Sequence, residues 1–204
     1  MLLLPLDFHT NMDLVAAARD PQRLCLDLHD CPEQVDQAML DARRVFCEAW
    51  DMVRREGRMD ERGYVGDGFS MEGMSELACD FSALISPEMF RRWVRPALEV
   101  EASVVRHAIF HWDGPRALVH FDEVMAMKGI HSVSYVPDPG ERHIQYLDLF
   151  KCVQACGKAV HIWGEVEEIK LMHPELDPAR VMYRPAVQTR AELDEFLAWL
   201  VRHT

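Results

Sequence analysis

The sequence predicts an α/β fold built on a parallel sheet, and two observations carry this prediction. From about residue 100 onward, four short runs rich in β-branched and aromatic residues recur, with centres about 24, 28 and 21 residues apart. Amphipathic stretches with helical spacing fill the gaps between these runs. Because parallel neighbours need a crossover connection of this length, the alternation indicates successive βα units.

Length and composition fit one soluble domain over residues 1–204, with 49% apolar and 27% charged residues. The 22 basic and 34 acidic residues give a net charge of −12, which argues against nucleic acid and anionic membrane surfaces as partners. The apolar run at the N-terminus is broken by Pro5 and Asp7, and no stretch is long enough to span a membrane. We therefore expect a cytoplasmic protein.

The first half of the chain is more helical than the second. Leu2–Phe8 is the first strand candidate. Apolar residues at three-and-four spacing then follow Pro32 as far as Gly57, which predicts one helix of roughly 24 residues. Tyr64–Phe69 is the second strand candidate.

A further helix is predicted to begin at Ser86-Pro87-Glu88. Serine caps the first turn, proline fits the turn without a backbone donor, and glutamate is favoured by the helix dipole. Pro96 is expected to kink this helix near its middle.

The second half supplies the four runs that define the sheet, at His107–His111, His131–Tyr135, Ala159–Trp163 and Val181–Tyr183. Apolar stripes predict helices that end at Gly129 and at Gly157, and Thr189 with Glu192 forms a capping box that opens the last helix. The prediction is thus about six parallel strands with surrounding helices, and residues 107–204 as four consecutive βα units.

Ligands bind at the carboxyl ends of the strands in parallel α/β folds. Histidine, aspartate and aromatic residues gather at the predicted ends, namely at His9, His111, Trp112, Asp113, Tyr135, Trp163 and Arg184. Aromatic walls with a few polar groups suit a small-molecule site, although loops also collect such residues without a functional reason. His161 lies mid-strand, where it either faces the interior of a barrel or is a satisfied core histidine.

His111 and Asp113 are two residues apart in an extended segment, so their side chains point to the same side. They could share a ligand or a metal ion, or the carboxylate could fix the imidazole tautomer for acid–base work. Two ligands fall short of a zinc site, and we expect zinc to be held weakly or not at all. Trp112 is expected to point the other way or to form a wall.

The order of several motifs resembles the uroporphyrinogen decarboxylase superfamily, which includes the methylcobamide:coenzyme M methyltransferases. These motifs are Asp80 to Phe90 with Ser86-Pro87 inside it, Pro96, His111-Trp-Asp-Gly-Pro115 and Gly157-Lys158. The resemblance covers most of the chain and implies a partial (β/α)8 barrel of the TIM type. It also implies an enzyme acting on a tetrapyrrole or corrinoid substrate, with a corrinoid protein as a further partner.

The chain departs from this family in residues that carry chemistry. It starts near the family's third barrel strand, so the first two units, with their substrate-binding aspartate and arginines, are absent. Asp80 stands at the place of a family serine, and Arg184-Pro185 stands where decarboxylases have His-Gly. The methyltransferases bind zinc through His-x-Cys and a later Cys, and here His111-x-Asp113 occupies that position.

The leading hypothesis is a methyltransferase or decarboxylase-type enzyme with His111 and Asp113 as its catalytic centre. Its substrate-binding residues are then His9, Asp80, Trp112, Tyr135, His161, Trp163 and Arg184. The alternative is a non-catalytic paralogue that binds a tetrapyrrole or a partner subunit. Since a barrel closes with eight strands, we also expect the chain to form a homo-oligomer or to bind a chain that fills the gap.

Overall fold

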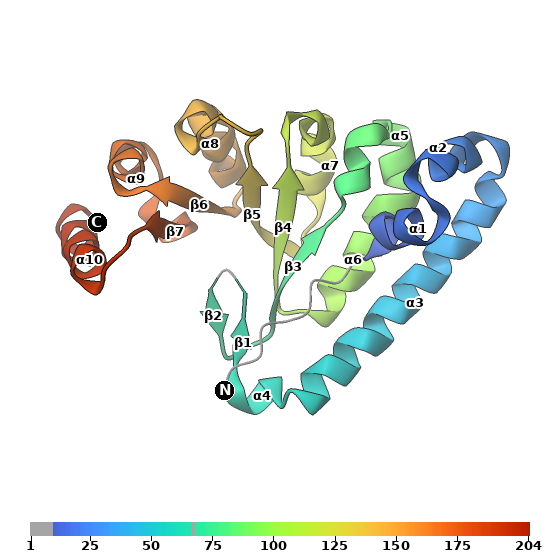
Figure 1. The fold of residues 1–204 in the computed structure, drawn as a ribbon, viewed down its shortest axis with the longest axis horizontal. Coiled ribbons are helices and arrows are strands. Elements are labelled where there is room, and N and C mark those ends of the chain that lie inside the picture. The colour runs from blue at the N-terminus through green and yellow to red at the C-terminus, as the bar shows by residue number, and fades with distance from the viewer. Residues whose placement is uncertain (1–9, 67) are drawn as a thin grey trace.

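The structure is a computed structural model that describes residues 10–66 and 68–204. Its centre is a five-stranded parallel sheet in the order β3-β4-β5-β6-β7 (Figure 1). The strands are β3 (Met74–Ala78), β4 (His107–Asp113), β5 (Ile130–Val136), β6 (Ala159–Glu165) and β7 (Val181–Ala186). All four pairings are parallel, so the predicted succession of βα units over residues 107–204 is confirmed.

The N-terminal part of the described chain is helical, with α1 (Asn11–Arg19), α2 (Pro21–Asp30), α3 (Pro32–Glu56) and α4 (Met59–Arg62). Helix α3 has the predicted bounds and buries a stripe that runs from Val35 through Met39 and Phe46 to Trp50. Its start follows from Pro32 in the first turn, and Gly57 is the residue that ends it.

The segment Tyr64–Phe69 is not a strand of the parallel sheet, and this expectation was wrong. It forms a separate antiparallel hairpin of β1 (Tyr64–Val65) and β2 (Phe69–Ser70). Gly66 and Gly68 lie between the two strands, and the Gly66 amide donates to the Gly68 carbonyl at 3.0 Å. The expected strand Leu2–Phe8 lies outside the described residues.

Between β3 and β4 the chain forms a 3-10 turn over Asp80–Leu84 and then an irregular helical run. This run consists of α5 (Pro87–Met89), a π-helical turn over Phe90–Val94, and α6 (Arg95–Val104). The Ser86 hydroxyl accepts a hydrogen bond from the Met89 amide at 3.3 Å, which is the predicted cap. The π turn ends two residues before Pro96, which has no amide hydrogen for a helical bond.

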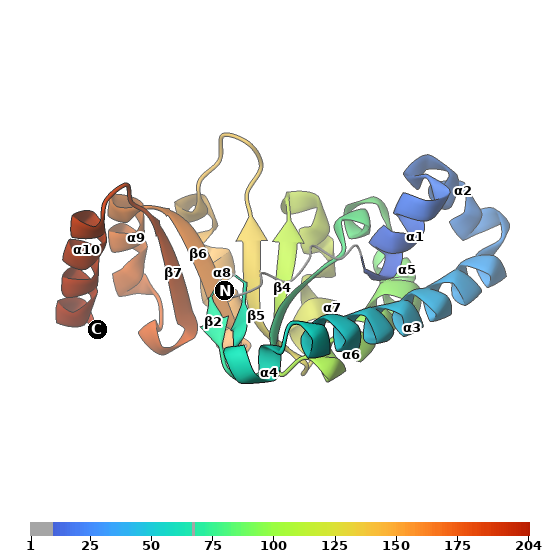
Figure 2. The same cartoon turned by 60° about the horizontal axis from the view of Figure 1, so that its bottom comes forward.

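The remaining connections are α7 (Phe121–Ala126), α8 (Leu147–Ala155), α9 (Val166–Met172) and α10 (Arg190–His203), with short 3-10 turns before α7 and α8. Phe110, Val133 and Ile162 are fully buried on the face of the sheet that these helices cover. The hairpin lies on the opposite face (Figures 1 and 2). A Cβ added at Gly66 would lie 3.6 Å from Met74 of β3, and one at Gly68 3.1 Å from Met182 of β7. The hairpin therefore lies over the amino-terminal half of this face.

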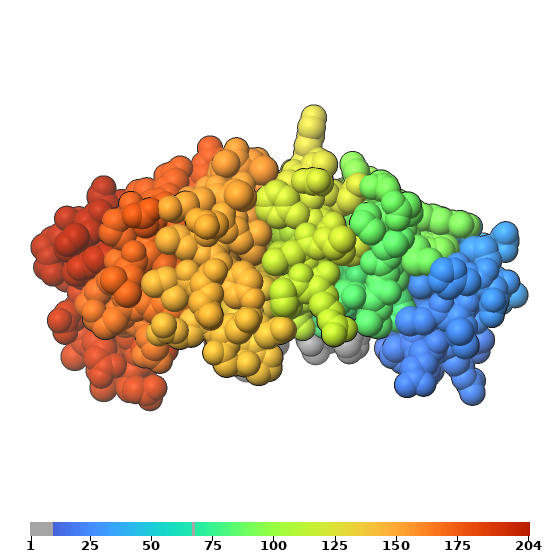
Figure 3. Space-filling view, turned by 90° about the horizontal axis from the view of Figure 1, so that it is seen from above, coloured from blue at the N-terminus to red at the C-terminus, as the bar shows by residue number. Residues whose placement is uncertain are grey.

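Along the parallel sheet, sequence order is also spatial order. In the view from above, colours run from α1 and α2 at one end of the long axis to α10 at the other (Figure 3). The strand order likewise never reverses, as it would in a doubly wound sheet. Within the described residues the five strands do not close into a barrel. No described helix combines the length and apolar character needed to cross a membrane.

Candidate functional site

The face of the sheet opposite α7 to α9, here called the open face, carries polar side chains towards the strand carboxyl ends. Strand register aligns His111 of β4 with Ser134 of β5 and His161 of β6 in one row. Residues in register on parallel strands point to the same side of a sheet. The open face therefore gathers Glu76, His111, Asp113, Ser134, His161, Trp163 and Arg184 from five different strands.

His111 and Glu76 form the central pair of this face. The imidazole Nδ1 lies 3.2 Å from Glu76 Oε1, and the two side chains are 31% and 37% exposed. The hydrogen bond and charge of Glu76, with smaller contributions from Asp80 and Asp113, raise the pKa of His111, although partial burial opposes this shift. Nε2 makes no hydrogen bond to any described residue.

Asp80 lies just beyond the end of β3, where it adds negative charge near His111. Its position is fixed from α1, because the Asp13 carboxylate accepts hydrogen bonds from the Asp80 and Phe81 amides, both at 2.8 Å. Asp113 is exposed at the end of β4 and on the same face as His111. The expected partner of the imidazole was Asp113, whereas the structure gives it Glu76.

The other side of the open face is formed by β6 and β7. His161 is 7% exposed, Trp163 is 38% exposed, and Trp163 is in register with the exposed Arg184 of β7. Glu76 and Asp113 thus lie on the β3 and β4 side of the face, whereas His161 and Arg184 lie on the β6 and β7 side.

Two expected wall residues lie elsewhere. Trp112 is 1% exposed and stacks on Phe121 at 6.0 Å, and Tyr135 is fully buried against Tyr146. Strand alternation turns both towards the helices, so neither lines the open face. Trp112 does point away from His111, as expected, and His9 lies outside the described residues.

Among the described residues, no group of three His, Cys, Asp or Glu side chains is close enough to hold a metal ion. The donors around His111 do not fit a zinc site, because Asp113 has no second ligand beside it that would complete a tetrahedral set.

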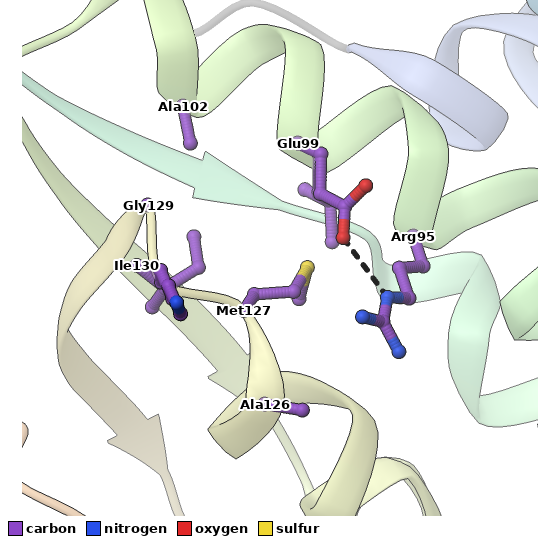
Figure 4. Close-up of a pocket in the computed structure, with 9 residues that line it drawn as sticks. Arg95, Glu99, Ala102, Ala126, Met127, Gly129 and Ile130 are labelled. Carbon is purple, nitrogen blue, oxygen red and sulfur yellow. Dashed lines mark hydrogen bonds and ion pairs between the residues drawn. The ribbon is translucent and has the colours of Figure 1, made fainter.

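A cavity of about 320 Å³ lies between α6 and the segment that enters β5, at the amino-terminal edge of the sheet (Figure 4). Arg95 and Glu99 form an ion pair at 3.0 Å on its rim, and Met127, Gly129 and Ile130 form its apolar wall. The cavity lies at the amino ends of the strands, whereas the His111–Glu76 pair lies towards their carboxyl ends, and the two share no residue.

Glu76 is the residue that sequence reasoning missed, because β3 was not predicted. The run Met74-Ser-Glu-Leu-Ala is short and holds only two large apolar residues. Spacing gave no signal either, since Glu76 lies 34 residues before the centre of β4, whereas the later strand centres are about 21 to 28 residues apart.

Comparisons of the chain with protein-family models, curated proteins and solved structures give no match.

Proposed function

We propose that this chain is a decarboxylase-type small-molecule enzyme built on part of a (β/α)8 barrel, as its resemblance to the uroporphyrinogen decarboxylase superfamily implies. The observation that carries the proposal is the His111–Glu76 pair at the carboxyl ends of β4 and β3. The unreversed strand order and the polar side chains at the strand carboxyl ends support the barrel type.

His111 is suited to hold and deliver a proton at Nε2. Glu76 accepts a hydrogen bond from Nδ1–H, which orients the ring and favours the imidazolium. In a decarboxylation, the bond between the substrate carbon and its carboxylate breaks and the electron pair remains on the carbon as CO2 leaves. His111 then gives the Nε2 proton to that carbon, and solvent returns a proton to the imidazole.

Methyl transfer to a zinc-bound thiolate is less well supported, because the described residues include no set of three zinc ligands at His111. A non-catalytic binding domain is the second candidate. The observation that favours it is the pair of sheet edges, at β3 and β7, which no other described strand covers.

The test is CO2 release from a panel of carboxylated pyrroles and aromatic acids, with the wild type compared with His111→Gln and His107→Gln. His107 is a matched control, since it lies on the same strand and face but at the amino end. We expect His111→Gln to reduce the rate at least about 100-fold and His107→Gln to leave it unchanged. Equal rates in the wild type and His111→Gln would refute the proposal, and binding without CO2 release would favour the second candidate.

A further inference from the structure

A second carboxyl group, Glu101 of α6, is buried behind the strand that carries Glu76. Its side chain is fully buried, and Oε2 lies 3.2 Å from both Thr10 Oγ1 and Asn11 Nδ2, which donate to it. Oε1 is also buried and has no hydrogen-bond partner among the described residues.

One of the two residues that contact Glu101, Asn11, also holds the carboxyl end of β3. Asn11 Nδ2 donates to the Ala78 carbonyl at 2.9 Å, and Ala78 is the register partner of His111. Two residues further on, Asp13 accepts the amides of Asp80 and Phe81. The start of α1 therefore connects Glu101 to the strand end on which the proposed site depends.

This turn does not hold its shape by local preference. Asn11 has a φ of +42°, in the left-handed region that only a few residue types enter readily, and it is fully buried. Contacts from the rest of the fold must hold it there, and Glu101 supplies two of them.

The groups that face Glu101 do not compensate a negative charge. They are Asp13 of α1, Cys47 of α3 and Cys79 after β3, so the described surroundings offer a like charge and two thiols but no cation. A buried carboxylate without a cation is strongly disfavoured. Burial accordingly raises the pKa of Glu101 to about 7, against hydrogen bonds from Asn11 and Thr10 that lower it.

We propose that Glu101 is a positioning residue whose protonated carboxyl fixes the Thr10–Asn11 turn against the end of β3, and whose ionisation releases that turn. This inference rests on the proposed function for its importance, because the strand end that it controls carries Glu76 and leads into Asp80. It makes the geometry around His111 depend on pH through a residue that lies outside the open face.

The direction of the pH effect follows from linkage. A released Glu101 returns to its ordinary pKa of 4.5, so opening of the turn rises about tenfold per pH unit between 4.5 and about 7, and then levels off. Closure is thus fully favoured in acid and is lost as pH rises through the pKa of the buried carboxyl. Protonation of Asp13 would weaken the same contact in acid and therefore acts with the opposite sign.

The experiment is amide hydrogen exchange of Asp80 and Phe81 in the full chain, followed by NMR from about pH 5 to pH 8 and corrected for intrinsic exchange. In the wild type we expect protection to fall on the order of 50-fold over this range. Glu101→Gln keeps an acceptor for Thr10 and Asn11 but cannot ionise, so its protection stays constant. Glu99→Gln, on the same helix with a half-exposed side chain, is the control and follows the wild type.

Constant protection in the wild type would overturn the proposal even if no variant folds. The proposal would also be overturned if amide protection fell equally with pH in Glu101→Gln, or if it stayed constant in Glu99→Gln. Because the readout is amide protection and not CO2 release, its outcome is separate from that of the proposed activity.

Discussion

At the residue scale, Gly157-Lys158, one of the motifs that resemble the family, has a structural role. Gly157 takes a φ of +83° where α8 ends, a conformation that glycine adopts without strain. The next residue, Lys158, is buried and donates to the Met127 and Ile130 carbonyls at 2.7 and 2.6 Å. Desolvation lowers the pKa of Lys158. Lys158 therefore links the start of β6 to the start of β5. This motif stabilises the sheet and does not form part of the candidate site.

His111 depends on Glu76 for its raised pKa, and Glu76→Gln tests this dependence. The substitution keeps a hydrogen-bonding group but removes the charge, so we expect the pKa of His111 to fall from its raised value. The measurement is an NMR pH titration of the imidazole resonances. Because the wild-type pKa is raised, the stability that this pair contributes is present in acid and is lost as pH rises through the His111 pKa.

The control for this titration is Glu72→Gln, since Glu72 lies 3.7 Å from His107 at the other end of the same strand. Glu72→Gln should leave the pH titration curve of His111 unchanged. A His111 curve that Glu76→Gln does not shift would show that the pair is not formed in solution.

At the element scale, helix termini were predicted well because their signals are local. Thr189 Oγ1 accepts the Glu192 amide at 3.2 Å, and Glu192 Oε2 accepts the amides of Gln188 and Thr189 at 2.7 and 3.4 Å. Strand β3 shows the opposite case. Its five residues lack the apolar density of the other strands, and it is held in the sheet by pairing with β4.

The capping box of α10 allows a direct stability prediction. Thr189→Ala leaves the Glu192 amide without its acceptor, and we expect a loss of about 1 kcal/mol in the free energy of unfolding. Urea denaturation measures the change, and Thr189→Ser, which retains the hydroxyl, should stay near the wild type. A Thr189→Ala midpoint equal to that of the wild type would mean that α10 does not unfold with the rest of the molecule.

At the scale of the whole molecule, helices cover one face of the described sheet, the hairpin covers part of the other face, and the sheet has two edges. Parallel sheets are normally covered on both faces or closed into barrels, because their open edges and faces pair with other chains. The outer edge of β7 pairs with no described strand, and Pro185 is its only residue without an amide donor. Apolar side chains on α10, Leu197 and Val201, are also exposed at this end.

We therefore expect the purified 23.6 kDa chain to self-associate at micromolar concentration. Sedimentation equilibrium is the measurement, and the expected result is a mass above that of one chain that rises with concentration. A folded, monodisperse monomer would contradict the prediction and would mean that the open side is sealed within one chain.

By itself, the sequence determined the helix α3, the capped helix starts and the four βα units from residue 107 onward. These depend on periodicity, caps and glycine or proline stops, all of which are read within a few residues of one another. It also placed His111 at a strand end on the side away from Trp112.

The tertiary structure alone decided which carboxylate meets His111, since Glu76 and His111 are brought together by pairing of β3 with β4 across 35 residues of chain. It likewise turned Trp112 and Tyr135 into the core and placed Glu101 beside Asn11, 90 residues away. Pairings over such distances follow from packing of the whole chain, because no local pattern records which of several carboxylates will share a strand neighbour or a buried site.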